Sequence, residues 1–504
     1  MNIYMKLNYL IFILLIQFLS INAQRKYENQ VRDMGIESLN RFKFFLSLAN
    51  DAANGNEIEE NINWVNKELK KRDFEIKLIQ TSSLPLMIAN LNIKEKLPTI
   101  ALYMHIDGQA VDPSKWNQED PYKAVIKRET SDGFETLSWD YLKTNKIEDL
   151  RIFARSTSDD KGPFAMFLTA LDYLKLVNKK PSFNIKLILD FEEEQSSPGL
   201  PESVKTNKDE LLADLLLIFD GPMHTSGKPT LVFGNRGIAT LTLTTYGPLK
   251  AQHSGHYGNY VPNPALSLAK VLASMKDDKG RVVIPNFYKG INLDKATKKV
   301  LEGVPSEDSS IKYRTQIAVT DKVGNTYQES IQYPSLNIRG MRSGWVGKEA
   351  RTIIPSTATA EMDIRLVVES DPLFLIESVK NHIKKLGYNI LNNEPSKQER
   401  LNFEKIITIK SKIAYPAFRT DTNAPEGKWL TKILTNYFGE KPVIIRTSGG
   451  SVPISPFVSE LGVPAIGVPT VNLDNNQHSP NENIRIGNYL NGIETYLAIL
   501  TTKF

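Results

Sequence analysis

The sequence of 504 residues contains no cysteine. Disulfide bonds, thiolate metal ligands, a cysteine nucleophile and a lipid-modified lipoprotein cysteine are therefore excluded. A chain of this length is stabilised without disulfides, because it is long enough to form two or three separate cores. Apolar residues make up 41% and charged residues 24% of the chain, which places it among globular rather than disordered proteins.

The sequence also lacks a strong excess of charge of one sign. It has 62 basic and 57 acidic residues, which gives a formal net charge of +5. The densest basic run, KELKKR at residues 67–72, contains a glutamate and is typical of a solvated helix face. No basic patch of the kind found in nucleic-acid-binding proteins is present, so we expect no nucleic-acid partner.

Long hydrophobic runs are absent except near the N-terminus. Lys6 precedes an unbroken apolar run over residues 10–16, and Ala23 offers a small residue at a cleavage site. The alternative is an uncleaved anchor, but the run is shorter than the roughly 20 residues that span a bilayer. We therefore expect residues 1–23 to be a cleaved signal peptide. The mature protein is expected to be periplasmic or extracellular, without a stable membrane anchor.

The hydrophobic pattern changes along the chain. From about residue 98 to 237, apolar β-type runs alternate with helical stretches, which predicts an α/β catalytic domain with a mainly parallel sheet and helices on both faces. Residues 238–413 instead carry strands with period-two alternation and intervening helices, which predicts an inserted α+β domain. The α/β character then returns. The predicted division is a signal peptide at 1–23, a catalytic domain at 24–237 and 414–504, and an inserted domain at 238–413.

Residues able to bind metal stand directly after several of the apolar runs. The acidic cluster Glu192-Glu193-Glu194 follows one run, His105-Ile106-Asp107 follows another, and Asp220 follows a third. Adjacent like charges gain nothing from packing at a strand end and become favourable where a cation or a proton transfer holds them. Because ligands of open α/β sheets bind beyond the carboxyl ends of the strands, we expect one shared site.

Two further segments supply candidates for the same site. Asp159-Asp160-Lys161-Gly162 opens a helical stretch, and His478 stands in a polar loop near the C-terminus. Two histidines and three carboxylates are enough for a two-metal hydrolytic centre, with one glutamate left over as a base. Adjacent side chains diverge, so one of the two aspartates is expected to bind metal while the other orients or caps. The same argument separates a ligand from a base in the glutamate pair.

Each of these motifs is ordinary when it stands alone. A His-x-Asp pair is commonly a surface contact, an aspartate at a helix start is commonly an N-cap, and a lone loop histidine is commonly solvated. The acidic cluster is not an ordinary surface loop, because an apolar strand precedes it and a Ser-Ser-Pro-Gly turn follows it.

Two glycine-containing segments suggest contacts with an anion. His253 lies in the turn His-Ser-Gly-His-Tyr-Gly and could hold an oxyanion or a third metal, or belong to a plain loop. Arg446 begins the segment Arg-Thr-Ser-Gly-Gly-Ser, which ends at Ser451. An arginine fork suits a carboxylate, and a glycine such as Gly450 allows backbone N–H groups to approach an anion.

Taken together and in this order, the motifs resemble those of the di-zinc metallopeptidase family 20, which contains carnosine dipeptidases, glutamate carboxypeptidases, bacterial dipeptidases and aminoacylases. The resemblance runs from about residue 30 to the C-terminus. It implies that Asp159 bridges two metals, that His105 and Asp220 complete one metal site, and that Glu194 and His478 complete the other. It also implies that Glu193 is the general base and that Asp107 orients the first histidine.

The resemblance extends to the inserted domain. It implies that residues 238–413 form a lid and dimerisation domain, and that His253 stabilises the tetrahedral intermediate. It further implies that the substrate carboxylate is held by Arg365, Arg446, Gly450 and Ser451. The sequence departs from the family pattern in having Ala154-Arg155-Ser156 where Gly-Arg-Gly is usual, but no departure removes a metal ligand.

We therefore expect an exported hydrolase that uses two divalent metal ions to cleave dipeptides or short peptides with a free carboxylate. Imidazole and carboxylate ligands suit zinc, and cobalt or manganese would also fit. A homodimer through the inserted domain is expected. The alternatives are an N-acyl amino acid deacylase of the same clan and a catalytically inactive binding homologue.

Overall fold

The computed structural model describes residues 29–143 and 146–504. The predicted signal peptide, residues 1–23, lies outside the described residues. The described chain forms two compact units. Unit 1 comprises the described residues up to Leu231 together with Asn423–Pro442 and Glu460–Phe504, and unit 2 comprises Val232–Thr422 and Val443–Ser459.

The main sheet of unit 1 is largely parallel, as predicted. Its strands run in the order β1-β2-β7-β3-β8-β20-β9. Strand β3 is parallel to both β7 and β8, and β20 is parallel to β8, whereas β1 and β2 are antiparallel additions. The bounds are β1 Glu75–Ile79, β2 Leu86–Leu91, β3 Thr99–His105, β7 Asn184–Asp190, β8 Leu215–Ile218, β9 Thr230–Val232 and β20 Ala465–Gly467.

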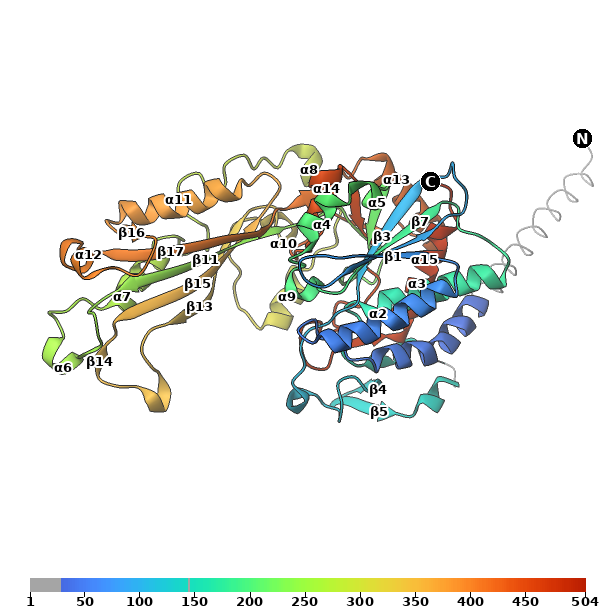
Figure 1. The fold of residues 1–504 in the computed structure, drawn as a ribbon, viewed down its shortest axis with the longest axis horizontal. Coiled ribbons are helices and arrows are strands. Elements are labelled where there is room, and N and C mark those ends of the chain that lie inside the picture. Colours follow the sequence, from blue (N-terminus) through green and yellow to red (C-terminus); the bar gives the residue numbers. More distant parts are fainter. Residues whose placement is uncertain (1–28, 144–145) are drawn as a thin grey trace, which may run out of the picture. The chain divides into compact units, whose positions relative to one another are not determined.

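Helices cover both faces of this sheet, which confirms the predicted fold class. All seven residues of β7 are buried, as expected for a strand between two helical layers. Figure 1 shows α2 and α3 on one side of the sheet and α4 and α5 on the other. The helices of unit 1 include α2 Gly55–Lys70, α3 Lys161–Leu176, α4 Leu200–Thr206, α5 Lys208–Leu211, α13 Pro425–Phe438 and α15 Ile486–Leu500. Within residues 29–143 and 146–504, no helix is both long and apolar enough to cross a membrane.

A second sheet of unit 1, which was not predicted from the sequence, brings two distant segments together. Its order is β21-β6-β4-β5. Strand β21 pairs antiparallel with β6, and Asn483 lies opposite Phe153. The loop that follows β6 therefore lies beside the loop that precedes β21. The bounds are β4 Val125–Thr130, β5 Gly133–Leu137, β6 Arg151–Phe153 and β21 Asn483–Arg485.

Unit 2 is built on a five-stranded sheet with the order β13-β15-β11-β17-β16. Residues of β11 alternate between buried and half-buried, so its alanine and leucines join the core while Thr240, Thr242 and Thr244 face the other side. Apolar residues of α7 and α11 complete that core. The bounds are β11 Gly237–Tyr246, β13 Ser335–Arg342, β15 Thr357–Leu366, β16 Asn389–Leu391, β17 Ile406–Tyr415, α7 Pro264–Ala273 and α11 Pro372–Lys385.

Shorter elements connect the strands of unit 2. They include β10 Gly234–Asn235, β12 Gln252–His253, β14 Ile353–Ile354, β18 Phe418–Arg419, β19 Val443–Ile445, α6 Ser254–Tyr257, α8 Lys295–Glu302, α9 Asp308–Thr315, α10 Tyr327–Ser330 and α12 Lys397–Asn402. Helix α14, Ser455–Leu461, begins in unit 2 and ends in unit 1.

Candidate metal centre

Five side chains predicted to bind metal come together in unit 1. They form two groups that share Asp159. His105, Asp159 and Asp220 make one group, and Asp159, Glu194 and His478 make the other. Within each group the potential ligand atoms all lie within 4.8 Å of one another.

The parallel sheet explains why the first residues meet. His105 is the last residue of β3 and lies opposite Asp190, the last residue of β7. Glu194 follows β7 within a short 3-10 turn, and Asp220 follows β8. The carboxyl ends of parallel strands meet at one edge of the sheet, so side chains more than 100 residues apart reach the same place.

The carboxylate of Asp159 contacts a histidine through each of its oxygens. Its Oδ1 lies 2.8 Å from Nε2 of His105, and its Oδ2 lies 3.0 Å from Nε2 of His478. The same Nε2 of His478 lies 3.3 Å from Oε2 of Glu194. Each oxygen of Asp159 thus faces a different group, which is the arrangement that a bridging ligand requires.

The donor set fits two divalent cations. Burial, with Asp159 nearby, raises the pKa of Glu194 to about 7 and the pKa of Asp220 to about 6. Carboxylates that crowd together in this way are unfavourable unless a cation neutralises them. Imidazole nitrogens and carboxylate oxygens are the ligands that zinc accepts in catalytic sites, and cobalt and manganese use them as well.

Asp107 holds two parts of this centre in place. Its Oδ1 lies 3.4 Å from Nδ1 of His105, on the side of the ring opposite Asp159. Its two carboxylate oxygens also accept hydrogen bonds from the backbone N–H groups of Glu193 and Glu194, each at 3.0 Å. A carboxylate that fixes the orientation of a ligand histidine is typical of metal sites.

Glu193 lies beside the centre but belongs to neither group of ligand atoms. Burial raises the pKa of Glu193 well above its usual range, and the neighbouring carboxylates of Asp220 and Glu194 act in the same direction. His105 acts in the opposite direction. The side chain is therefore adjacent to the ligands and available for proton transfer.

Asp160 and Lys161 form hydrogen bonds to backbone groups near the centre. The side chain of Asp160 makes no N-cap hydrogen bond to α3; instead its Oδ2 accepts one from the backbone N–H of His105 at 3.3 Å. Lys161 is buried, and its Nζ donates to the backbone carbonyls of Phe45 and Leu48 at 3.0 and 2.6 Å. Of the two adjacent aspartates, Asp160 orients and does not cap.

Glu482 is fully buried and has a role that was not predicted from the sequence. Its carboxylate accepts a hydrogen bond from Nη1 of Arg155 at 2.8 Å. It also accepts bonds from the backbone N–H groups of Ser156, Ser158 and Asp159 at 2.9, 2.9 and 3.1 Å. Glu482 thus fixes the loop that presents Asp159. Pairing of β6 with β21 creates this contact, and no local sequence pattern predicts it.

The residues predicted to hold the substrate carboxylate all lie in unit 2. Nη1 of Arg365 donates to Oγ of Ser451 at 2.7 Å, and the Arg365 side chain is about one-third exposed. Arg446 is more enclosed: its Nη1 donates to Oε1 of Gln332 at 2.6 Å, and its Nη2 lies 3.6 Å from Glu369. Arg365 and Ser451 are therefore adjacent, whereas Arg446 already has partners within the protein.

Gly450 and His253 also lie in unit 2. The backbone carbonyl of Gly450 accepts a hydrogen bond from the N–H of Arg236. His253 is exposed and caps α6, with Nδ1 accepting from the N–H of Gly255 at 3.0 Å. Neither group of potential metal ligands in the described parts of the chain includes His253. Its predicted role at the oxyanion stays a prediction.

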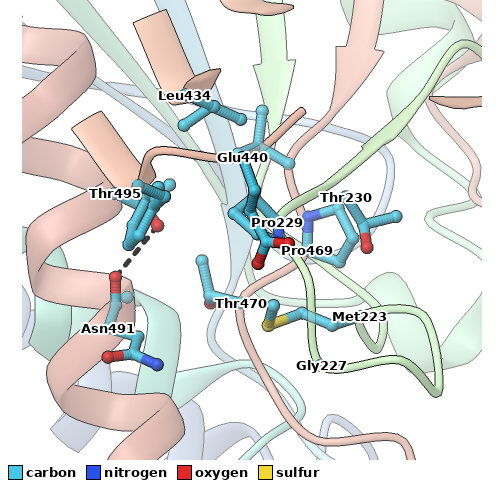
Figure 2. Close-up of a pocket in the computed structure, with 13 residues that line it drawn as sticks. Met223, Gly227, Pro229, Thr230, Leu434, Glu440, Pro469, Thr470, Asn491 and Thr495 are labelled. Atoms are coloured by element: carbon cyan, nitrogen blue, oxygen red, sulfur yellow. Dashed lines mark hydrogen bonds between the residues drawn. The ribbon is translucent and has the colours of Figure 1, made fainter. Parts of the chain in front are cut away.

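Unit 1 also contains a cavity of about 130 Å³ that is separate from this centre. Figure 2 shows it lined by residues that include Met223, Leu434 and Thr470. A hydrogen bond from Thr495 to the carbonyl of Asn491 lies on one wall. None of the five potential metal ligands lines this cavity.

Comparison with known proteins agrees with the geometry. The family model of Peptidase family M20/M25/M40 matches residues 101–502. The Cys-Gly metallodipeptidase dug1 of Schizosaccharomyces pombe is 26% identical over 471 residues, which are 85% of this chain and 94% of the relative. The Beta-Ala-His dipeptidase of Rattus norvegicus is 24% identical over 82% of this chain and 79% of the relative. An M20 family metallo-carboxypeptidase from Sulfolobus solfataricus superposes with a TM-score of 0.75 at 27% identity, covering 92% of this chain and 98% of that one.

Proposed function

The chain belongs to Peptidase family M20/M25/M40 and is a metal-dependent peptidase, and from that premise we propose that it cleaves dipeptides or short peptides with a free carboxylate. The observation that carries the proposal is the pair of ligand groups sharing Asp159, with Glu193 beside them and outside both. The names of the relatives, a Cys-Gly metallodipeptidase and a Beta-Ala-His dipeptidase, support a dipeptide substrate.

The proposed reaction follows from the roles of these side chains. When bound, two divalent cations would polarise the scissile carbonyl and acidify a water molecule. Glu193 takes a proton from that water so that the resulting hydroxide attacks the carbonyl, and Glu193 then gives the proton to the leaving amine as the C–N bond breaks. Asp107 keeps the His105 ring and the backbone of Glu193 in place during both transfers. His253 donates to the oxyanion.

Arg365 and Ser451 are proposed to bind the carboxylate of the substrate. A guanidinium recognises a carboxylate through two parallel hydrogen bonds, which gives orientation as well as energy. Arg446 contributes less directly, because Gln332 and Glu369 already engage its guanidinium.

The test compares one dipeptide as the free acid and as the C-terminal amide, with zinc, cobalt or manganese added. We expect the amide to be cleaved at least tenfold more slowly, and Arg365→Gln to remove most of that difference. Arg339→Gln is the matched control, because Arg339 is an exposed arginine of the same unit. Equal rates for the two substrates, with faster cleavage of N-acyl amino acids, would instead identify a deacylase.

Export and dimerisation are further parts of the proposal. Export rests on residues 6–23 of the sequence, and N-terminal sequencing of the exported protein should begin near Gln24. A homodimer is supported by β13, which is an edge strand of the unit 2 sheet and exposes Ile338 and Met341. Light scattering should give about twice the chain mass, and Ile338→Lys should reduce it to that of a monomer.

A further inference from the structure

A buried arginine of unit 2, Arg236, makes no direct ion pair within the described part of the chain. Arg236 is 8% exposed, and its Nη2 donates to the carbonyl of Tyr333 at 3.0 Å and to Oγ of Ser335 at 2.9 Å. Its Nε is buried and makes no hydrogen bond, and none of the ion pairs in the described part of the chain includes Arg236. Burial lowers the pKa of Arg236 to about 10, and Arg365 acts in the same direction, whereas Tyr327 and the carboxylate of Asp363 act in the opposite direction. The guanidinium is therefore charged at neutral pH.

A cavity of about 190 Å³ lies beside this guanidinium. Most of its wall is apolar and is formed by Val282, Val323, Ile331 and Leu336. Two charged side chains, Lys276 and Asp321, also line it and lie 3.3 Å apart. Both are substantially exposed, with 38% and 65% of their side chains accessible, so their charges are solvated while that of Arg236 is not.

These features match a particular ligand chemistry. A buried guanidinium that makes no direct ion pair is unfavourable, and the nearest carboxylate, Asp363, also faces Arg365 at 3.7 Å. An anion in the cavity would therefore stabilise the protein. The volume corresponds to roughly six water molecules, which accommodates a small organic acid. Water would satisfy the N–H groups of Arg236 but would not form an ion pair with it, and it would leave the apolar wall hydrated.

We propose that this cavity binds a small carboxylate with an apolar body, whose carboxylate pairs with Arg236 and whose body packs against Val282, Val323 and Leu336. The ligand has two possible sources, a free apolar amino acid and an acid without an amino group. An amino acid would bring an ammonium group for which Asp321 is the acidic partner. None of the residues that line the cavity is assigned to the peptidase reaction proposed above.

The test is calorimetric titration of the full-length, metal-loaded protein with 4-methylpentanoate and, separately, with leucine. Removing a charge-assisted hydrogen bond costs about 1.5–3 kcal/mol, so Arg236→Gln should weaken binding by about 10- to 100-fold. Arg339→Gln, the exposed control, should bind as tightly as the wild type.

A second variant distinguishes binding in this cavity from binding at the metal centre and from a folding defect. Val323→Trp fills the cavity while leaving Arg236 and its hydrogen bonds in place, so it tests the site even if Arg236→Gln fails to fold. It should abolish binding, whereas a carboxylate bound only at the metal centre would be unaffected by it. Unchanged affinity in the Val323→Trp variant, or no measurable binding of either acid at about 10 mM, would overturn the proposal.

The two ligands identify the source. Tighter binding of leucine, with an advantage that Asp321→Asn removes, supports the proposal with a free amino acid as ligand. Equal or tighter binding of 4-methylpentanoate supports it with an acid that lacks an amino group.

Discussion

Replacing Glu482 by glutamine should destabilise unit 1 and weaken metal binding together. Glu482 and Arg155 are 0% and 3% exposed, so the substitution leaves a buried guanidinium without its carboxylate. Breaking a buried ion pair by removing one partner costs about 3–5 kcal/mol. The neutral glutamine side chain would also accept weaker hydrogen bonds from the three backbone N–H groups that now donate to Glu482. At this cost, the melting temperature of unit 1 should fall by on the order of 10 °C.

The metal effect follows from the position of Asp159, whose backbone N–H is one of those three groups. Loss of a group that orients a ligand typically lowers metal affinity by about 10- to 100-fold. The assays are thermal unfolding of the metal-free protein and competition with a chromogenic chelator. Glu129→Gln is the control, because Glu129 is largely exposed and Arg151, which it faces at 3.3 Å, keeps Asp474 as a second acidic partner.

A double substitution separates the ion pair from the rest of the loop. Arg155→Met combined with Glu482→Gln also removes the buried guanidinium that Glu482→Gln leaves unpaired. The double variant should therefore be less destabilised than Glu482→Gln alone. If the free energy of unfolding of Glu482→Gln lies within about 1 kcal/mol of the wild-type value, the carboxylate does not hold the loop in place.

Three other outcomes are expected. Chelation should abolish activity and zinc, cobalt or manganese should restore it; full activity in protein shown to be free of metal would contradict the site. Arg151 holds the pKa of Asp474 at about 2 despite burial. Asp474 therefore stabilises the fold fully at pH values above its unfolded pKa of about 4, and this stabilisation is lost as the pH falls toward 2. Because Asp474 is half exposed, Asp474→Asn should cost only about 1 kcal/mol in urea unfolding at neutral pH and nothing near pH 2; a difference that stays constant with pH would refute this role of the ion pair. If His253 acts on a partner subunit, inactive His253→Ala and Glu193→Gln chains should recover activity on mixing, whereas heterodimers without activity would place the histidine in its own chain's site.

Much of the fold followed from local sequence patterns. Strand β3 is a continuous apolar run that ends in a histidine, and a strand buried on both faces needs that composition. The period-two alternation of β11 likewise predicted a sheet with one buried face. The five potential ligands were found because each follows such a run or stands in a polar loop, and the sheet topology brings them together.

Features that depend on long-range pairing were not predicted. The four-stranded sheet joins β6 to β21, which are more than 300 residues apart, so Glu482 gave no local signal as a partner of the Asp159 loop. Similarly, an arginine in a glycine-containing loop suggested anion binding by Arg446, whereas Gln332 and Glu369 engage it in the folded chain. A sequence shows which groups are available but not which of them the fold has already paired.

The most direct test of the central claim compares Glu193→Gln with Glu194→Gln by measuring bound metal and turnover in the same preparations. Glu194 is assigned as a ligand and Glu193 as the base, although the two are adjacent in sequence. Glu193→Gln should retain the metal content of the wild type and lose roughly two to four orders of magnitude in turnover. Glu194→Gln should lose metal. Equal loss of metal from both variants, or metal loss confined to Glu193→Gln, would contradict the assignment.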